Sequence, residues 1–196
     1  MDGAGMRARG PGRVRIVGGA KRGTLLKVPP GGVTRPTGEM VREAVFDALG
    51  PVAGLRVLDL FAGTGAMGLE ALSRGARDCV FVEEDRGVCT VLRANIAALE
   101  YEAQCRVMNA GYLQAVRTFA QRRSGFDLLF LDPPYRMLSE VEAMVTPLLP
   151  SLLSNDGVAV VEGDRAMEAT LGGDPVFDRA YGDTRVVMVR MRRTTS

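Results

Sequence analysis

The chain has 196 residues, of which 46% are hydrophobic and 24% are charged, so it is long enough for one globular domain with a large core. No apolar run approaches the roughly 18 residues of a membrane-spanning helix, and the Arg- and Gly-rich start lacks the apolar segment of a signal peptide. We therefore expect a cytoplasmic protein with no membrane partner. The absence of histidine excludes Ser-His and Cys-His nucleophile pairs, and three cysteines without a C-x-x-C pair predict buried free thiols and no metal site.

The net charge of +2 is unevenly distributed along the chain. The first 50 residues hold nine Lys and Arg against four Asp and Glu, whereas the remainder holds sixteen against nineteen. A basic segment on a nearly neutral body favours a polyanionic partner such as nucleic acid. The alternative is a solvated tail. The excess of 23 arginines over two lysines can itself reflect coding bias alone.

The first 50 residues predict a small extension ahead of the main domain. Residues 1–12 are rich in Gly, Arg and Pro without an apolar period, which is typical of a disordered basic tail. Residues 13–17 alternate basic and apolar side chains like a half-buried strand, and residues 24–28 can pair with them after a Gly-Gly turn. A Pro/Gly linker leads to a helix at residues 37–49 with an apolar stripe, ended by a Gly-Pro pair. We expect residues 13–50 to form an N-terminal extension made of a hairpin and a helix, which carries the basic residues.

Strands and helices alternate from residue 55 onward, which predicts βαβ units and a parallel sheet covered on both faces. The predicted strands lie at residues 56–60, 79–83, 105–108, 126–131 and 158–162. The predicted helices lie at residues 66–74, about 86–99, about 112–123 and about 139–153, the last broken by prolines. Two further strands, at residues 176–181 and 185–191, flank a Gly-Asp turn. We expect residues 51–196 to form one α/β domain with a mostly parallel seven-stranded sheet and a C-terminal antiparallel hairpin.

A glycine-rich turn follows the first strand of this domain. Gly63, Gly65 and Gly68 fit the G-x-G-x-x-G pattern, in which a strand, a turn and a helix N-terminus place backbone N–H groups around a ligand. Asp59 stands four residues before Gly63. A pyrophosphate-binding loop gains nothing from an anion there, whereas a ligand with a positively charged amino group gains a partner. The alternative is that Asp59 caps the following turn.

Acidic residues end three of the predicted strands, namely Asp59, Glu83 and Asp132. In an open parallel sheet, ligands bind beyond the carboxyl ends of the strands, so we expect these side chains to share one site. Glu83 lies 20 residues after Gly63, about where a carboxylate receives ribose hydroxyls in dinucleotide sites.

The sequence Asp132-Pro133-Pro134-Tyr135 follows the fourth strand of the domain. Two prolines fix the backbone there, so that Asp132 and the Pro133 carbonyl can accept both protons of an exocyclic amino group. Holding both N–H groups aims the nitrogen lone pair at an electrophile. Tyr135 offers a ring on which a planar base can stack. The alternative is a structural Pro-Pro turn with a packed tyrosine.

The glycine-rich motif and the Asp-Pro-Pro-Tyr motif together resemble class I S-adenosylmethionine-dependent amino-methyltransferases, which have a Rossmann-like fold. Further segments resemble the RsmD family: Arg-Ile-Val-Gly-Gly (15–19), Arg-Gly (22–23), Arg-Pro-Thr (35–37), Val-Arg-Glu (41–43), Gly-Leu-Glu-Ala-Leu-Ser-Arg-Gly (68–75) and Tyr-Gly-Asp-Thr (181–184). Members of this family methylate N2 of a guanine in 16S ribosomal RNA. The resemblance covers roughly residues 13–190.

The resemblance implies a role for each part of the site. The S-adenosylmethionine would contact Asp59, Phe61, Ala62, Gly63, Thr64, Gly65, Glu83, Glu84, Asn109, Ala110 and Gly111. The guanine would lie against Asp132, Pro133, Pro134 and Tyr135, and RNA would be held by Arg13, Arg15, Lys21, Arg22, Arg35, Thr37 and Arg42. Relatives often carry Asp or Asn near position 111, where this chain has Gly111. The adenine contact would then fall to Asn109 or a backbone amide.

The implied partner is 16S ribosomal RNA or a small-subunit particle, bound by a monomer. Three other functions stay open. An amino-methyltransferase acting on adenine N6 or cytosine N4, in DNA or another RNA, would use the same four residues. An NAD(P)-dependent oxidoreductase would use the glycine-rich loop but leaves Asp59 and the Pro-Pro turn unexplained. A catalytically silent RNA-binding module is the third.

Overall fold

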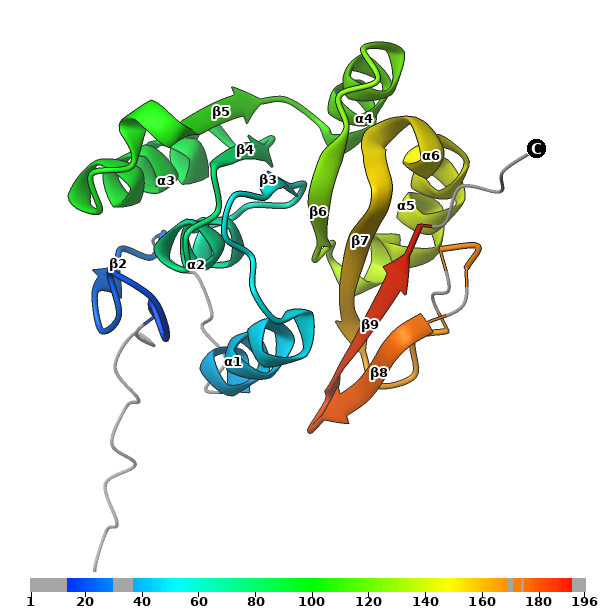
Figure 1. Cartoon of the computed structure of the whole chain (residues 1–196), viewed down its shortest axis with the longest axis horizontal. Helices are drawn as coiled ribbons and strands as arrows, with labels where there is room; N and C mark the ends of the chain where they lie inside the picture. The colour runs from blue at the N-terminus through cyan, green and yellow to red at the C-terminus, as the bar shows by residue number, and fades with distance from the viewer. Residues whose placement is uncertain (1–13, 30–36, 169–170, 174, 192–196) are drawn as a thin grey trace, which may run out of the picture.

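The computed structural model describes residues 14–29, 37–168, 171–173 and 175–191 (Figure 1). The predicted tail at residues 1–12, together with Arg13 and Arg35, lies outside the described residues, as does the side chain of Thr37. A seven-stranded sheet forms the centre of the molecule, and a small two-stranded hairpin lies at its side.

The sheet has the strand order β5-β4-β3-β6-β7-β9-β8. Its strands are β3 (Arg56–Asp59), β4 (Asp78–Glu83), β5 (Cys105–Asn109), β6 (Phe126–Leu131), β7 (Leu153–Asp164), β8 (Pro175–Tyr181) and β9 (Thr184–Arg190). Strands β3 to β7 are parallel, and β9 pairs antiparallel with both β7 and β8. The predicted fold class, a mostly parallel seven-stranded α/β sheet with a C-terminal antiparallel hairpin, is confirmed.

Helices cover both faces of the sheet (Figure 1). They are α1 (Thr37–Leu49), α2 (Ala66–Ser73), α3 (Arg86–Ala98), α4 (Tyr112–Gln121), α5 (Leu138–Val145) and α6 (Leu149–Leu152), with 3-10 turns η1 (Glu102–Gln104), η2 (Tyr135–Met137) and η3 (Thr146–Leu148). Successive strand residues point to opposite faces, so Val57 packs in the buried cluster with α1, α2 and α3, and Leu58 packs in the one with α4, α5 and α6. Burial on both faces explains the unbroken apolar runs of the central strands.

The segment before the last parallel strand differs in detail from its prediction. Prolines interrupt the predicted helical stretch, with Pro147 in η3 and Pro150 in the first turn of α6. Strand β7 is longer than the predicted 158–162, because it begins at Leu153 opposite Phe126 and its pairing with β6 shifts register before Val158.

A two-stranded hairpin, β1 (Val14–Arg15) paired with β2 (Leu25–Leu26), precedes the sheet and lies beside α2 and α3 (Figure 1). Its strands are shorter than predicted because neighbouring backbone amides donate to buried side chains of these helices. The N–H of Val17 donates to Glu70 at 2.8 Å, and the N–H of Lys27 donates to Asn95 at 2.7 Å. Ile16 and Leu26 are buried in the cluster that contains α1, α2 and α3. The hairpin is therefore packed on the main body.

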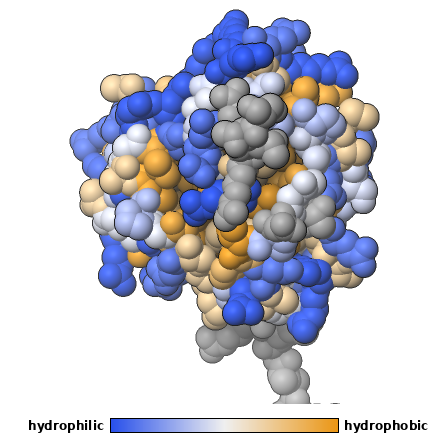
Figure 2. All heavy atoms as spheres, turned by 45° about the vertical axis from the view of Figure 1, so that its right-hand side comes forward, coloured by the Kyte–Doolittle hydropathy of each residue, from blue (hydrophilic) through white to orange (hydrophobic). Residues whose placement is uncertain are grey.

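The surface and the interior follow the composition. On the face turned forward in Figure 2, hydrophilic residues surround apolar ones that gather between them. The three cysteines are free, with Cys79 and Cys89 buried and Cys105 half-buried. Across the described ranges, no helix has the length and apolar character that crossing a membrane would need.

Candidate active site

A cavity of about 680 Å³ opens at the carboxyl ends of the parallel strands, next to the β3–β6 pair where the strand order reverses. Ligand sites of small molecules and cofactors commonly have volumes of about 300–1,000 Å³. The predicted site residues on its wall are Phe61, Glu83, Glu84, Ala110, Asp132, Pro133, Pro134 and Tyr135. Sequence analysis missed the others, which are Leu60, Val82, Tyr112, Arg136 and Met137. Residues far apart in the sequence thus face one space.

The glycine-rich turn between β3 and α2 is held by hydrogen bonds from three of its backbone amides. The N–H of Ala62 donates to the Val82 carbonyl at 3.0 Å, and that of Gly65 donates to the Ala62 carbonyl at 2.7 Å. The N–H of Gly63 donates to Glu83 Oε2 at 3.0 Å. The turn is therefore fastened to the end of β4 as well as to itself.

Two of the three glycines are required by close packing. Gly65 has φ of 83°, and a side chain there would collide with Leu92 of α3. Gly68 lies in α2 where the helix approaches β4, and a Cβ atom there would collide with Phe81 and Cys79. The pattern thus reflects a tight turn and close helix–strand packing, both of which bring the start of α2 to the sheet edge.

Glu83, the predicted ribose-binding residue, is half-buried in the cavity wall. Its Oε2 accepts the N–H of Gly63 at 3.0 Å, and its Oε1 accepts the N–H of Asp85 at 2.9 Å. Each carboxylate oxygen has a second lone pair, so the group can brace the turn and still accept hydroxyls from a ligand.

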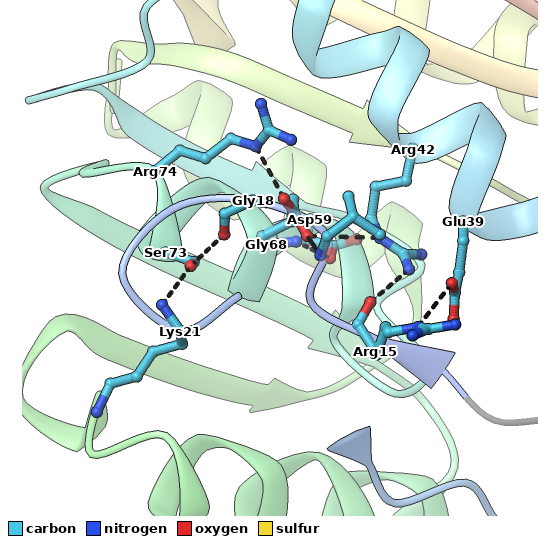
Figure 3. Close-up of polar contacts among 11 residues, drawn as sticks. Arg15, Gly18, Lys21, Glu39, Arg42, Asp59, Gly68, Ser73 and Arg74 are labelled. Carbon is cyan, nitrogen blue, oxygen red and sulfur yellow. Dashed lines mark hydrogen bonds and ion pairs between the residues drawn. The ribbon is translucent and has the colours of Figure 1, made fainter. Parts of the chain in front are cut away.

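Asp59 lies deeper than the other acidic strand ends, with only 4% of its surface exposed, and it is not part of the cavity wall. Its Oδ2 accepts the N–H of Gly68 in the first turn of α2 at 3.0 Å (Figure 3). This contact is the capping alternative considered above. Burial raises the pKa of Asp59 from 3.8 to about 7; the Gly68 hydrogen bond lowers it and the charge of Glu83 raises it. Its pairing with a ligand amino group stays a prediction.

The predicted adenine region separates into residues that face the cavity and residues that do not. Ala110 lines the cavity, whereas Nδ2 of Asn109 donates to the backbone carbonyls of Glu83 and Glu84 at 3.0 and 2.8 Å. Asn109 therefore braces the end of β4. A Cβ atom at Gly111 would lie 3.9 Å from Oε2 of Glu84, so the Glu84 carboxylate lies next to the position that lacks a side chain.

Two aromatic rings stand on the same side of the cavity. The ring centroids of Phe61 and Tyr112 are 5.3 Å apart and their planes differ by 34°. The Tyr112 hydroxyl donates to Glu140 of α5 at 3.0 Å. Tyr112 is the first residue of the amphipathic helix α4, and the helical pattern alone indicates a packing residue. The signal that could have identified it is its position just beyond the carboxyl end of β5, after Ala110 and Gly111.

The Asp132–Tyr135 segment turns sharply at the mouth of the cavity. Asp132 is exposed, Pro133 is buried and Tyr135 is half-buried. The Pro134 carbonyl accepts the N–H of Met137 at 2.8 Å, which closes the turn into η2. The next residue, Arg136, is exposed and is the one cation among the described residues that line the cavity.

Arg42, one of the residues predicted to hold RNA, does not face solvent, so the structure does not support that prediction. Its side chain is only 6% exposed, its Nε lies 3.7 Å from Oε2 of Glu70, and its guanidinium donates to the Arg15 carbonyl at 2.8 Å (Figure 3). The physical reason is that Glu70 is fully buried, and a buried carboxylate requires charged or hydrogen-bonding partners. Arg42 is therefore an internal residue.

The other described cations of the predicted RNA grip do not gather at the cavity. Arg15 forms an exposed ion pair with α1, and Lys21 pairs with Glu100 at 2.8 Å. Lys21 and Arg22 lie in the hairpin turn, where the N–H of Lys21 donates to Ser73 Oγ at 2.9 Å (Figure 3). Ser73 is the last residue of α2, whose first residue follows the glycine-rich turn at the carboxyl end of β3. The hairpin turn therefore lies toward the amino ends of the parallel strands, opposite the cavity.

Comparison with known proteins shows similarity over nearly the whole chain. The model of the family described as conserved hypothetical protein 95 matches residues 14–190. The chain is 38% identical over 184 residues to YlbH of Bacillus subtilis (strain 168), named as a candidate rRNA methyltransferase, with 91% of this chain and 100% of that protein covered. It is 43% identical over 128 residues to ribosomal RNA small subunit methyltransferase D of Escherichia coli (strain K12), covering 65% and 63%. The structure of yhhF from Escherichia coli, described as a candidate methyltransferase, has a TM-score of 0.78 and 30% identity, covering 93% of this chain and all of that one.

Proposed function

We propose a function for this chain, which belongs to the RsmD family described as conserved hypothetical protein 95. It transfers a methyl group from S-adenosylmethionine to N2 of a guanine in 16S ribosomal RNA. One observation carries the proposal: the Asp-Pro-Pro-Tyr segment and the acidic end of β4 line a single cavity at the switch in strand order. A methyl donor and an amino acceptor can therefore meet there. The relatives named as rRNA methyltransferases support ribosomal RNA as the substrate.

The residues on the cavity wall fit S-adenosylmethionine. Glu83 can accept the ribose hydroxyls, and the rings of Phe61 and Tyr112 can flank the adenine. Asp59, behind the glycine-rich turn, is the candidate partner for the amino group of the methionine part. When bound, S-adenosylmethionine supplies an electrophilic methyl group on a sulfonium, which is already a good leaving group.

The acceptor side of the cavity holds the guanine. The guanine leaves its stack in the RNA to reach the cavity. Asp132 and the Pro133 carbonyl accept the two N–H groups of N2, and Tyr135 stacks on the base. Most of the rate comes from holding this nitrogen close to the methyl carbon. The amino group becomes acidic only as the new N–C bond forms, so Asp132 takes up its proton late and need not be a strong base beforehand.

The substrate is either free 16S ribosomal RNA or an assembled small-subunit particle, and the protein acts on it as a cytoplasmic monomer. Arg136 on the cavity wall and Lys27, whose backbone is bonded to Asn95 beside the glycine-rich turn, bind phosphates without reading sequence. The buried Arg42 takes no part in this contact.

The test is methyl transfer from tritiated S-adenosylmethionine to 16S ribosomal RNA, offered free and as small-subunit particles from cells that lack the activity. The RNA is then digested to nucleosides, and N2-methylguanosine is the expected labelled product. Label in N6-methyladenosine or N4-methylcytidine would show that the acceptor is another amino group and not guanine N2. If the folded protein transfers no label at all, the proposal is overturned. Asp132→Ala should lose most of the activity, whereas Asp47→Ala, at an exposed position of α1, should keep it.

A further inference from the structure

The side chain of Asn95 joins the glycine-rich turn to the N-terminal hairpin. Asn95 lies on α3 and is 1% exposed. Its Nδ2 donates to the Thr64 carbonyl of the turn at 2.9 Å and to the Lys27 carbonyl of the hairpin segment at 3.0 Å. Its Oδ1 accepts the N–H of Lys27 at 2.7 Å. One buried amide therefore uses both of its protons and its oxygen on backbone groups of two separate segments.

This contact completes the fastening of the turn. The amides of Ala62, Gly63 and Gly65 are bonded to the end of β4 or to the turn itself, and Asn95 holds the carbonyl of Thr64. Leu92, one helical turn before Asn95, packs so closely on the turn that only glycine fits at position 65. One face of α3 thus fixes the position of the turn.

The hairpin in turn fixes the orientation of the Asn95 amide. If the Lys27 backbone were not in place, the oxygen and one proton of this buried amide would lose their partners, and a buried polar group without a partner is costly. The amide would then rotate or admit water, and its bond to Thr64 would weaken.

We propose that Asn95 is a positioning residue for S-adenosylmethionine, and that the N-terminal hairpin is therefore part of the cofactor site. The identity of this ligand rests on the proposed function above.

Ser73 provides a matched control, because it fastens the same hairpin without touching the glycine-rich turn. Its hydroxyl accepts the N–H of Lys21 at 2.9 Å and donates to the Gly18 carbonyl at 2.6 Å (Figure 3). Ser73 is 3% exposed, so it resembles Asn95 in burial as well as in its hydrogen bonds to the hairpin.

The experiment compares Asn95→Ala and Ser73→Ala in the full-length protein. S-adenosylmethionine affinity by calorimetry should fall about ten-fold in Asn95→Ala, the loss expected for a buried hydrogen-bonded amide, and should stay within about two-fold in Ser73→Ala. Both variants should unfold at a lower temperature. Amide hydrogen exchange at residues 63–65 should accelerate only in the Asn95 variant, and only its KM for S-adenosylmethionine, not that for RNA, should rise. If Asn95→Ala does not fold, Asn95→Leu decides, since it has nearly the same volume, introduces no buried charge and removes all three hydrogen bonds.

An unchanged affinity in the folded Asn95 variant would overturn this inference. An equal loss in Ser73→Ala would also overturn it, because the effect would then be general loosening of the hairpin. A wild-type protein that does not bind S-adenosylmethionine would instead remove the proposed function itself, and the inference with it.

Discussion

Two aspartates at the ends of neighbouring strands have opposite surroundings. Asp59 is buried next to α2 and its pKa is raised to about 7, chiefly by burial, whereas Asp132 is exposed at the mouth of the cavity. A buried carboxylate gains most from an adjacent positive charge, and an exposed one can pass a proton to water. We therefore assign Asp59 to the amino group of the methyl donor and Asp132 to the amino group of the acceptor.

The raised pKa of Asp59 predicts pH-dependent cofactor binding. Affinity for S-adenosylmethionine should rise between about pH 6 and pH 8, because the protonated carboxyl must release its proton before it can pair with an ammonium group. Asp59→Asn should bind more weakly at pH 8 and lose most of this dependence. Calorimetry in buffers of different ionisation enthalpy would count the released proton. A wild-type affinity that does not change with pH would contradict the assignment.

The same pKa shift predicts the opposite trend for folding. Between the unfolded value near 3.8 and the folded value of about 7, the folded protein holds a proton that the unfolded chain has released. The contribution of Asp59 to the free energy of unfolding is thus fully present below about pH 4 and is lost as the pH rises through about 7. Urea denaturation of Asp59→Asn should show a smaller fall in stability from pH 4 to pH 7 than wild type. Equal falls would mean that Asp59 does not titrate in this range.

Variants of the Asp132–Tyr135 segment should separate chemistry from binding. Asp132→Ala removes one of two acceptors for the amino group and should slow the chemical step about 10²–10³-fold with little change in RNA affinity. Tyr135→Phe should be nearly silent and Tyr135→Ala damaging, because the ring and not the hydroxyl has the assigned role. Single-turnover methylation at saturating RNA measures these rates. If Tyr135→Phe were as inactive as Asp132→Ala, the hydroxyl would take part in the reaction.

One buried carboxylate, that of Glu70, connects three elements: the hairpin, α1 and α2. Glu70 of α2 accepts the N–H of Val17 at 2.8 Å and Nε of Arg74 at 2.8 Å, and Arg42 of α1 lies 3.7 Å away. Glu70→Ala would leave the Arg42 charge buried without its partner and should cost about 3–5 kcal/mol of unfolding free energy. Urea denaturation would measure this loss.

The control for this element is Glu43→Ala on the exposed face of α1, which should change stability by less than about 0.5 kcal/mol. A double variant, Glu70→Gln with Arg42→Met, should recover part of the loss because it leaves no unpaired buried charge. A Glu70→Ala protein as stable as Glu43→Ala would show that the buried contact contributes nothing to stability.

The strands and helices of the body were predictable because their signals are local. The apolar run of β6 ends directly at Asp132, and the turn at residues 63–65 separates a strand pattern from a helix pattern. The burial of Arg42 was not predictable, since it depends on a partner, Glu70, on another helix. The same holds for Asn95, whose three backbone partners come from two other segments. The boundary predicted at residue 50 stays a prediction.

The whole molecule has two unlike edges. The cavity edge, at the carboxyl ends of the parallel strands, carries the acidic ends of β3 and β4 together with Arg136. Lys27 belongs to the same edge, because its backbone is bonded to Asn95 beside the glycine-rich turn. The opposite edge carries Arg22 in the hairpin turn and Arg123 between α4 and β6. With a net charge of only +2, RNA attraction depends on where the cations stand more than on their total.

Paired charge removals at the two edges should therefore have different effects. Lys27→Gln with Arg136→Gln should reduce the slope of log K against log salt for RNA binding by about 1.4–1.8, because each phosphate contact contributes about 0.7–0.9. Arg22→Gln with Arg123→Gln removes the same charge and should leave the slope nearly unchanged. Binding titrations at several salt concentrations measure both slopes. Equal reductions of the slope by both pairs would mean that RNA contacts both edges. A reduction of the slope confined to the Arg22 and Arg123 pair would place the RNA-binding surface at the opposite edge, where the hairpin turn lies.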